Sequence, residues 1–289
     1  MIHPSYLKTL KENNQKISMI TCYDYSSARI ISQSKIDVVL VGDSLGMVIY
    51  GYSSTLQVSM EQMIYHTEAV ARGLKGEKLL VSDMPFLSYQ TSTKDAVLNA
   101  GSLVKAGANI VKVEGGKRVI DKIKAIIDAD IPVMGHLGLT PQSINITGGY
   151  KLQAKTESEI EKLYEDALLL EKEGCCAIVL ELVPEEVAKV ITENLKIPTI
   201  GIGAGKFCDG QVLVFHDMLG FFTDFKPKHV KHYSNLSEEI LNSLNKFSEE
   251  VKNNKFPEEE NTFRLQSNID PYKIIKKVTS KFDLPTQEE

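Results

Sequence analysis

Four short apolar runs in this chain each end in an acidic residue. Buried strands read as near-continuous apolar runs, so an acid at the end of each is not random surface charge. If the four strands are parallel neighbours, the four carboxylates meet at one edge. Like charges at close range cannot all stay ionised in a dry site without a cation or shared protons. The pattern therefore predicts a metal site, an acid–base site, or both. The four acids are Asp43, Asp83, Glu114 and Glu181.

Two further side chains with chemistry map to the same predicted edge. Lys112 lies two residues before Glu114 on one predicted strand, so the two point to the same face. His136 ends another predicted strand. Each residue alone also has a structural explanation: an acid can cap a helix, Glu114 can pair with Lys112, and a lone histidine is often a core residue. These structural explanations account for single residues but not for the whole set, because capping does not require four acids, a lysine and a histidine on one face.

Carboxylates with few histidines or cysteines around them favour a hard cation such as Mg²⁺. Mg²⁺ usually takes one or two protein carboxylates and keeps positions for water and substrate. We therefore expect Asp43 and Asp83 to hold the ion, while the other acids hydrogen-bond its waters or act on substrate. A substrate with adjacent carbonyl and carboxylate oxygens would chelate the ion, and Lys112 would neutralise its charge.

The order of elements favours an α/β fold, a single (β/α)8 barrel of the TIM type with a C-terminal helical extension. Alternating strands and helices imply a parallel sheet, and barrels of this kind bind ligands at the carboxyl ends of their strands. All six candidate residues map to that end. Only Gly201–Gly210 separates the last two strands, which is too short for an ordinary crossover helix. The predicted strands are Ile17–Tyr23, Val38–Asp43, Lys78–Asp83, Asn109–Glu114, Ile131–His136, Cys176–Glu181, Ile197–Gly201 and Gln211–Phe215.

Several helices have local start signals. Ser59 and Thr156 each begin a capping box, and Pro184 fits the first position of a helix. The glycine-rich segment Gly201–Gly205 has neither Walker nor Rossmann spacing. We interpret it as a close backbone approach to a ligand or a neighbouring strand.

Composition limits the other possibilities. Proteins bind nucleic acids through clustered cationic side chains, so the net charge of −5 over 289 residues argues against a nucleic-acid partner. No apolar stretch approaches the roughly 20 residues of a membrane span, and the start shows no secretory signal. Four cysteines without a C-x-x-C pair indicate reduced thiols and a cytoplasmic setting.

The chain resembles one family over roughly Pro4–Phe263, the ketopantoate hydroxymethyltransferases, also called 3-methyl-2-oxobutanoate hydroxymethyltransferases. The resemblance implies residues 1–263 as a catalytic barrel and 264–289 as an extension of unknown role. The matching segments are Thr21–Tyr25, Val41–Val48, Ser82–Phe86, Val111–Gly116, Pro132–Gln142 and Gly201–Gly205.

The resemblance implies a reaction and a set of roles. The family transfers a one-carbon unit from 5,10-methylenetetrahydrofolate to 2-oxoisovalerate through a Mg²⁺-stabilised enolate, giving 2-dehydropantoate for pantothenate and coenzyme A synthesis. The electrophile, a folate iminium or released formaldehyde, stays open, as do the folate-contacting residues. Members assemble as homo-oligomers, with decamers known in the family. By resemblance Asp43 and Asp83 bind Mg²⁺ with Glu114 in its outer shell, Ser44 and Lys112 hold the substrate carboxylate, His136 lies near the transferred group, and Glu181 is the base.

Two other functions remain as alternatives. One is a Mg²⁺-dependent 2-oxo-acid lyase or mutase of the phosphoenolpyruvate mutase–isocitrate lyase group, although the K-K-C-G-H loop typical of its lyases is absent. The other is a metabolite-binding barrel without turnover, which the combination of Glu181, Lys112 and His136 disfavours.

Overall fold

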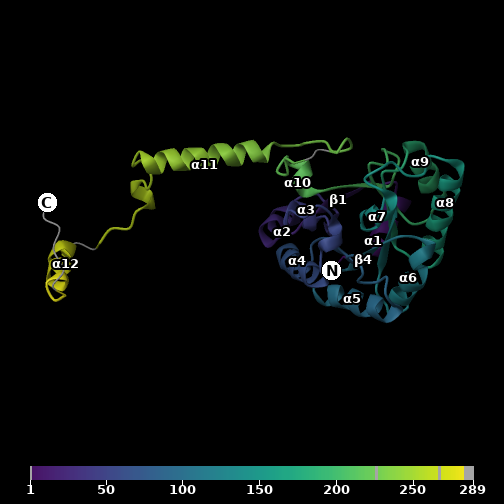
Figure 1. Ribbon diagram of the computed structural model, residues 1–289, viewed down its shortest axis with the longest axis horizontal. Coiled ribbons are helices and arrows are strands. Elements are labelled where there is room, and N and C mark those ends of the chain that lie inside the picture. The colour runs from purple at the N-terminus through teal and green to yellow at the C-terminus, as the bar shows by residue number, and fades with distance from the viewer. Residues whose placement is uncertain (1, 225–226, 266–267, 283–289) are drawn as a thin grey trace. The chain divides into compact units, whose positions relative to one another are not determined.

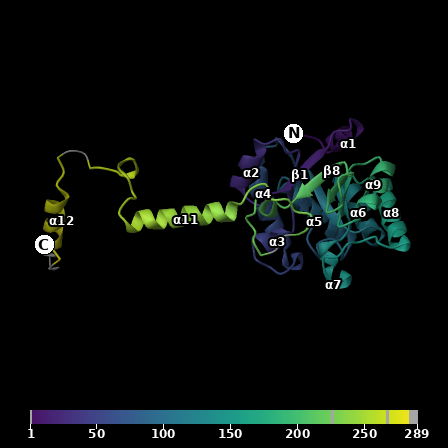
Figure 2. The ribbon, with the colours of Figure 1, turned by 90° about the horizontal axis from the view of Figure 1, so that it is seen from above.

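The chain folds around a closed barrel of eight parallel strands in sequential order. The computed structural model describes residues 2–224, 227–265 and 268–282, and Figures 1 and 2 show the barrel with its surrounding helices. The predicted (β/α)8 fold is confirmed, and each strand overlaps its predicted range. The strands are β1 (Ile17–Thr21), β2 (Val38–Val41), β3 (Leu79–Asp83), β4 (Ile110–Glu114), β5 (Val133–Gly138), β6 (Ala177–Glu181), β7 (Thr199–Ile202) and β8 (Gly210–Leu213).

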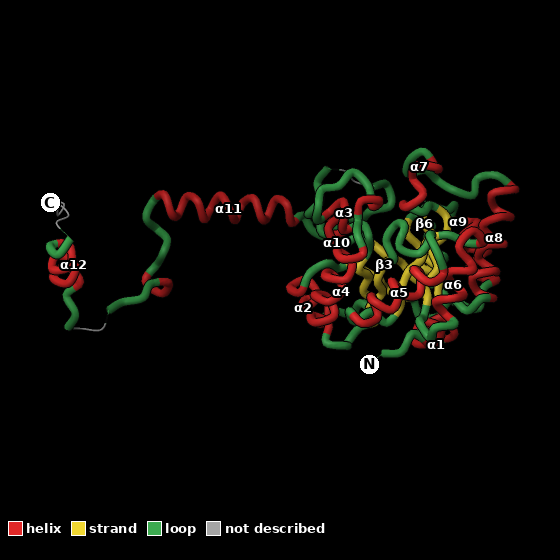
Figure 3. The backbone as a smooth tube through the Cα atoms, turned by 60° about the horizontal axis from the view of Figure 1, so that its bottom comes forward, coloured by secondary structure: helices red, strands yellow, loops and turns green. Residues whose placement is uncertain are grey.

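Helices separate the strands everywhere except between β7 and β8, where the chain passes directly from one strand to the next. Figure 3 shows the helices in red around the yellow strands. Both predicted capping boxes are present, at Ser59 and Thr156. Pro184 precedes its helix as the N-cap, one position earlier than expected. The helices of the barrel are α1 (Ser5–Glu12), α2 (Tyr25–Ser32), α3 (Leu45–Val48), α4 (Met60–Leu74), α5 (Thr93–Lys105), α6 (Ile120–Ile127), α7 (Ile144–Thr147), α8 (Glu157–Lys172), α9 (Glu185–Asn194) and α10 (Phe215–Met218).

Apolar side chains fill the lower part of the barrel interior. Alternate residues of each strand point inward, so Val38 and Leu40 of β2 belong to the interior cluster while Val39 and Val41 face the helices. Leu7 of α1 belongs to the same interior cluster. We infer that α1 closes the amino end of the barrel and leaves the carboxyl end for ligands.

The same alternation brings polar side chains inward near the carboxyl ends of the strands. On β4, Lys112 and Glu114 follow the interior residue Ile110 at intervals of two. The strand register pairs Asp83 with Lys112 and Glu114 with His136. A polar layer therefore lies on top of the apolar layers, at the end of the barrel where catalysis takes place in this fold.

The C-terminal part of the chain forms a second unit. Packing divides the chain into two compact units, residues 1–237 and 238–289. The predicted boundary of the catalytic region at residue 263 stays a prediction. The helical extension predicted from the sequence begins with α11 (Leu236–Lys252). Beyond it lie a short 3-10 turn, Glu259–Asn261, and α12 (Pro271–Thr279).

The capping box of α4 gives a prediction about stability. The Ser59 hydroxyl accepts a hydrogen bond from Gln62 N, which otherwise lacks a partner within the helix. Ser59→Ala should lower the free energy of unfolding by about 1 kcal/mol. Urea denaturation would measure the change, with the exposed Ser53→Ala as a control. An unchanged midpoint for Ser59→Ala would show that the cap does not stabilise the barrel.

Candidate active site

The predicted acids do meet at the carboxyl end of the barrel. The Lys112 ammonium lies 3.0 Å from Asp83 Oδ1, and both side chains are buried. Asp83 Oδ2 accepts a hydrogen bond of 3.0 Å from the backbone N–H of Asp43. Asp43 is also buried, two residues beyond the end of β2. The structure therefore brings the first two aspartates and the lysine into direct contact.

His136 joins the remaining two acids to this group. Its Nε2 lies 3.2 Å from Glu181 Oε2, and its Nδ1 lies 3.3 Å from Glu114 Oε1. The same Nδ1 is 3.1 Å from the Lys112 ammonium. One ring nitrogen can serve only one of these partners at a time: protonated Nδ1 faces Glu114, and unprotonated Nδ1 can accept from Lys112. His136 is thus a buried titratable link between the acids and the lysine.

Ser44 lies at the edge of the site, next to Asp43. Its hydroxyl is 2.8 Å from the phenol oxygen of Tyr23, which is fully buried. Ser44 precedes the short helix α3, and its backbone carbonyl accepts from Met47 N at 3.0 Å. The hydroxyl is therefore held in place beside the aspartates, as an oxygen-binding role requires.

Two residues of the site were not assigned a role from the sequence. Gln142 is buried and donates from its side chain to Asp43 Oδ2 and from its backbone to Glu114 Oε2, both at 2.9 Å. The hydroxyl of buried Tyr89 lies 2.9 Å from Gln142 Oε1 and accepts from Glu114 N at 3.2 Å. Gln142 falls in a motif that carried the family resemblance, but amides and phenols at loop positions give no chemical signal of their own.

Burial and crowding shift the pKa values of the aspartates upward. Desolvation raises the pKa of Asp43 well above its ordinary value, and the nearby charges of Asp83 and Glu114 raise it further. Desolvation also raises the pKa of Asp83, although Lys112 opposes this shift. A raised pKa means that the charged form of each carboxyl is less favourable than in water, and a bound cation would offset this cost.

The lysine and the histidine have the opposite tendency. Burial by itself lowers the pKa of Lys112, but Asp83, Glu114 and Asp43 outweigh it and raise the pKa above its ordinary value. Burial and Lys112 lower the pKa of His136, yet the contacts with Glu114 and Glu181 raise it to about 9. Burial raises the pKa of Glu114, but His136 and Lys112 hold it below the usual range. Both cationic groups are therefore stabilised in charged form.

The donor set fits a magnesium ion held by two aspartates. Asp83 Oδ1 and Glu114 Oε1 are buried and have no well-aligned hydrogen bond in the structure. Even with Lys112 and His136 both protonated, the four carboxylates leave two negative charges unbalanced. Among the described residues, no three His, Cys, Asp or Glu side chains form a closed metal cage. Mg²⁺ needs no such cage, because one or two carboxylates, water and substrate complete its shell.

The loop after β5 covers part of this region. Tyr150 lies in this loop, and its hydroxyl donates to Met47 Sδ of α3 at 3.4 Å. Burial raises the pKa of Tyr150, and the charges of Glu181 and Asp43 contribute to the rise. The contact with Met47 links this loop to α3, the helix that follows Asp43 and Ser44.

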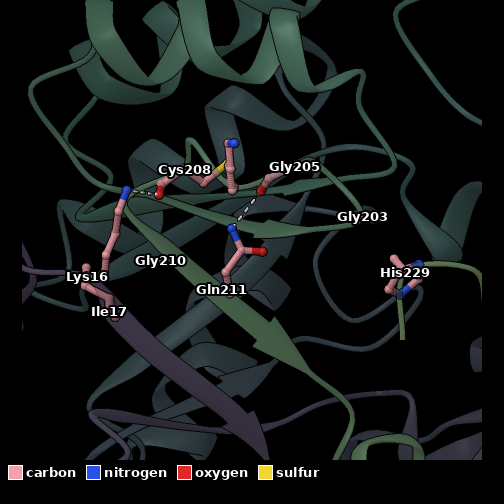
Figure 4. A pocket seen from close by; sticks show the side chains of 9 residues that line it. Lys16, Ile17, Gly203, Gly205, Cys208, Gly210, Gln211 and His229 are labelled. Atoms are coloured by element: carbon pink, nitrogen blue, oxygen red, sulfur yellow. Dashed lines mark hydrogen bonds between the residues drawn. The ribbon is translucent and has the colours of Figure 1, made fainter. Parts of the chain in front are cut away.

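A separate pocket of about 400 Å³ lies outside the polar cluster, and none of the predicted site residues lines it. Figure 4 shows Lys16, Gln211 and His229 around it, with Gln211 donating to Gly205 O. The segment Gly201–Gly205 was interpreted as a close backbone approach. At Gly203 the close neighbours are side chains, since an added Cβ there would lie 2.7 Å from Leu182 and 3.2 Å from His229. The glycines thus allow close packing beside this pocket.

Comparison with known proteins identifies the family. A family model described as ketopantoate hydroxymethyltransferase matches residues 2–259. The chain belongs to this family. A 3-methyl-2-oxobutanoate hydroxymethyltransferase of Clostridium botulinum (strain 657 / Type Ba4) is 55% identical over 92% of this chain and 96% of its own. The protein of that name from Caldicellulosiruptor saccharolyticus is 56% identical over 88% and 96%. The chain is accordingly a member of a transferase family, as the sequence motifs predicted.

Similar solved structures share the fold at low identity. Phosphonopyruvate hydrolase, solved with oxalate and Mg²⁺, has a TM-score of 0.60 at 12% identity and covers 98% of this chain and 99% of its own. A 2,3-dimethylmalate lyase of the phosphoenolpyruvate mutase–isocitrate lyase superfamily has a TM-score of 0.58 at 13% identity, covering 98% and 95%. The family predicted as the alternative therefore shares the architecture, while the sequence family is that of the hydroxymethyltransferases.

Other sequence expectations were also tested. None of the helices in the described ranges has the length and apolarity to cross a membrane. All four cysteines have free thiols, and three of them are buried: Cys22, Cys175 and Cys208. Burial raises the pKa of the Cys22 thiol to about 12, so this side chain stays a neutral thiol at physiological pH.

The raised pKa of His136 predicts a pH-dependent stability of the metal-free chain. A histidine with a pKa of 6.5 when unfolded and about 9 when folded stabilises the fold fully below pH 6.5. This contribution is lost as the pH rises through about 9, with a slope of up to about 1.4 kcal/mol per pH unit. Urea denaturation across this window should show the fall, and His136→Gln should remove it. The exposed His3→Gln should keep it; a flat profile in the parent would contradict the shift.

Proposed function

We propose that this chain transfers a hydroxymethyl unit from 5,10-methylenetetrahydrofolate to 2-oxoisovalerate, forming 2-dehydropantoate with Mg²⁺ as cofactor. The family assignment supports the acceptor and the type of transfer. The observation that carries the proposal is a run of contacts beside the pair Asp43 and Asp83: Glu181 contacts His136, and His136 in turn contacts Lys112. A base, a cation for a carboxylate and a two-carboxylate cation site are what this reaction needs in one place.

The substrate is held by charge and hydrogen bonds. The carboxylate of 2-oxoisovalerate requires a cationic partner, and Lys112 offers a permanently charged ammonium at the base of the site. Ser44, fixed by Tyr23, offers a hydroxyl on the same side. Asp43 and Asp83 would hold Mg²⁺, with Glu114 accepting hydrogen bonds from its waters. When bound, the ion would polarise the keto oxygen and stabilise charge that develops there by several kcal/mol.

Glu181 is suited to remove the proton at C3 of the substrate. It is the most exposed of the four acids, with 14% of its side chain accessible. Its carboxylate contacts His136, whereas Asp83 contacts Lys112, so we assign Glu181 no role as a metal ligand. A positioned carboxylate base typically contributes about 10²–10⁴-fold. His136, 3.2 Å away, orients this carboxylate and can take up or return a proton near the transferred group.

We also propose a location, an oligomeric state, a class of partner and a catalytic region for the enzyme. Free, mostly buried thiols favour a cytoplasmic location. The family resemblance supports a homo-oligomer, with a decamer as the expected form. The substrates we propose are small molecules, and the net negative charge disfavours nucleic acid as a partner. The resemblance also supports residues 1–263 as the catalytic region, with residues 264–289 serving another role.

Exchange of the C3 hydrogen tests the base. Glu181→Gln keeps the shape of the side chain but removes the charge of the basic oxygen. Exchange of this hydrogen of 2-oxoisovalerate into deuterated water, followed by NMR with Mg²⁺ and without folate, should slow by about 10²–10⁴-fold. The exposed Glu186→Gln is the control and should exchange at the parent rate. If Glu181→Gln also exchanges at the parent rate, Glu181 is not the base.

Metal binding tests the aspartate pair. Asp83→Asn removes one of the two charged ligands and leaves the shape of the side chain, so Mg²⁺ affinity and activity should both fall while the fold is kept. Calorimetric titration with MgCl₂ in the presence of 2-oxoisovalerate measures the affinity, and circular dichroism checks the fold. An unchanged affinity in the folded variant would remove Asp83 from the metal site.

A further inference from the structure

Gln142 connects three loops at the mouth of the barrel. Its side chain is 5% exposed and lies in the segment after β5. The side-chain Nε2 donates to Asp43 Oδ2, after β2, and to Met84 O, after β3, both at 2.9 Å. The backbone N–H donates to Glu114 Oε2, at the end of β4, also at 2.9 Å. One buried residue therefore holds two of the carboxylates at fixed positions.

The surrounding groups fix the orientation of the Gln142 amide. Its nitrogen faces two acceptors, the Asp43 carboxylate and the Met84 carbonyl. Its oxygen faces two donors, the Tyr89 hydroxyl at 2.9 Å and Gln90 Nε2 at 3.2 Å. A flipped amide would place oxygen against oxygen on one side and nitrogen against donors on the other. The two acceptors on the nitrogen side therefore direct the amide N–H groups at Asp43 and Met84.

These bonds divide the carboxylate oxygens into two sets. Asp43 Oδ2, Asp83 Oδ2 and Glu114 Oε2 each accept from an N–H group of the protein. Asp83 Oδ1 and Glu114 Oε1 are the buried oxygens without a well-aligned hydrogen bond. On Asp43, Oδ1 is the oxygen that is not bonded to the Gln142 amide. Asp83 Oδ1 faces the Lys112 ammonium at 3.0 Å and Glu114 Oε1 faces His136 Nδ1 at 3.3 Å, so the oxygens turned away from the N–H groups are turned toward the cationic side chains of the site.

We infer that Gln142 is a positioning residue for the divalent-cation site, setting which oxygens of Asp43 and Glu114 face the ion. The inference rests on the Mg²⁺ site of the proposed function and assigns Gln142 no contact with the ion or the substrate. Outer-shell partners of metal ligands typically contribute about 10–100-fold to metal affinity, because they remove rotational freedom from the ligand. A purely structural role for Gln142 would instead affect only stability.

Calorimetric titration of the full chain with MgCl₂, with and without 2-oxoisovalerate, separates these roles. Gln142→Met keeps an unbranched side chain of similar length, loses the amide donor, and leaves the backbone N–H. We expect the Mg²⁺ affinity of this variant to fall by about 10–100-fold. The control is Gln33→Met, the same substitution at the exposed C-cap position that follows α2, which should bind Mg²⁺ as the parent does. Thermal unfolding of the metal-free proteins gives the stability of each variant.

The outcomes distinguish this inference from the proposed function. Parent-like Mg²⁺ affinity in folded Gln142→Met, with or without a lower melting temperature, overturns the inference and leaves the metal site in place. The absence of Mg²⁺ binding by the parent overturns both. If Gln142→Met does not fold, Gln142→Asn takes its place: it retains the amide but is one methylene shorter, so it cannot reach Asp43 and Tyr89 together. The same loss of affinity is expected, and an unchanged affinity overturns the inference.

Discussion

Charge balance in a buried volume is the constraint on which the site depends. Four carboxylates gather at the carboxyl end of the barrel, and Lys112 is the buried ammonium beside them. An isolated buried charge would cost several kcal/mol, so each group persists in charged form only through its neighbours. Lys112 and protonated His136 offset part of the charge. The negative charge that remains explains both the raised pKa of Asp43 and the suitability of the site for a divalent ion.

The carboxylates gather at the carboxyl end of the barrel because apolar side chains already fill the interior toward the amino end. Apolar side chains such as Leu40 and Ile110 occupy the inward positions of the strands, and Leu7 of α1 closes the amino end. On β3 to β6 the polar residues then follow on the same inward positions, two residues further along, whereas Asp43 lies beyond the end of β2. Rigid strands hold these groups more precisely than loops could, and the loops add orienting residues such as Gln142 and Tyr89 around them.

Much of the fold and part of the site could be predicted from the sequence. The apolar runs with terminal acids gave the strands and the candidates Asp43, Asp83 and Glu181, because strand burial and side-chain alternation are local properties. The capping boxes were equally local. The contacts of Gln142 could not be predicted from the sequence, because an amide can donate to and accept from many kinds of group and its residue type does not select a partner. The division into compact units near residue 237 depends on which residues pack together, and the predicted boundary of the catalytic region at residue 263 stays a prediction.

The sequence by itself determined the fold class, the family and the identity of the side chains at the barrel mouth. Those features follow from periodicity and from long motifs, which are written along the chain. Only the tertiary structure decided which groups touch: Lys112 pairs with Asp83 instead of its strand neighbour Glu114, and His136 lies between Glu114 and Glu181. Partner choice depends on strand register and barrel closure, which bring together residues far apart in the chain.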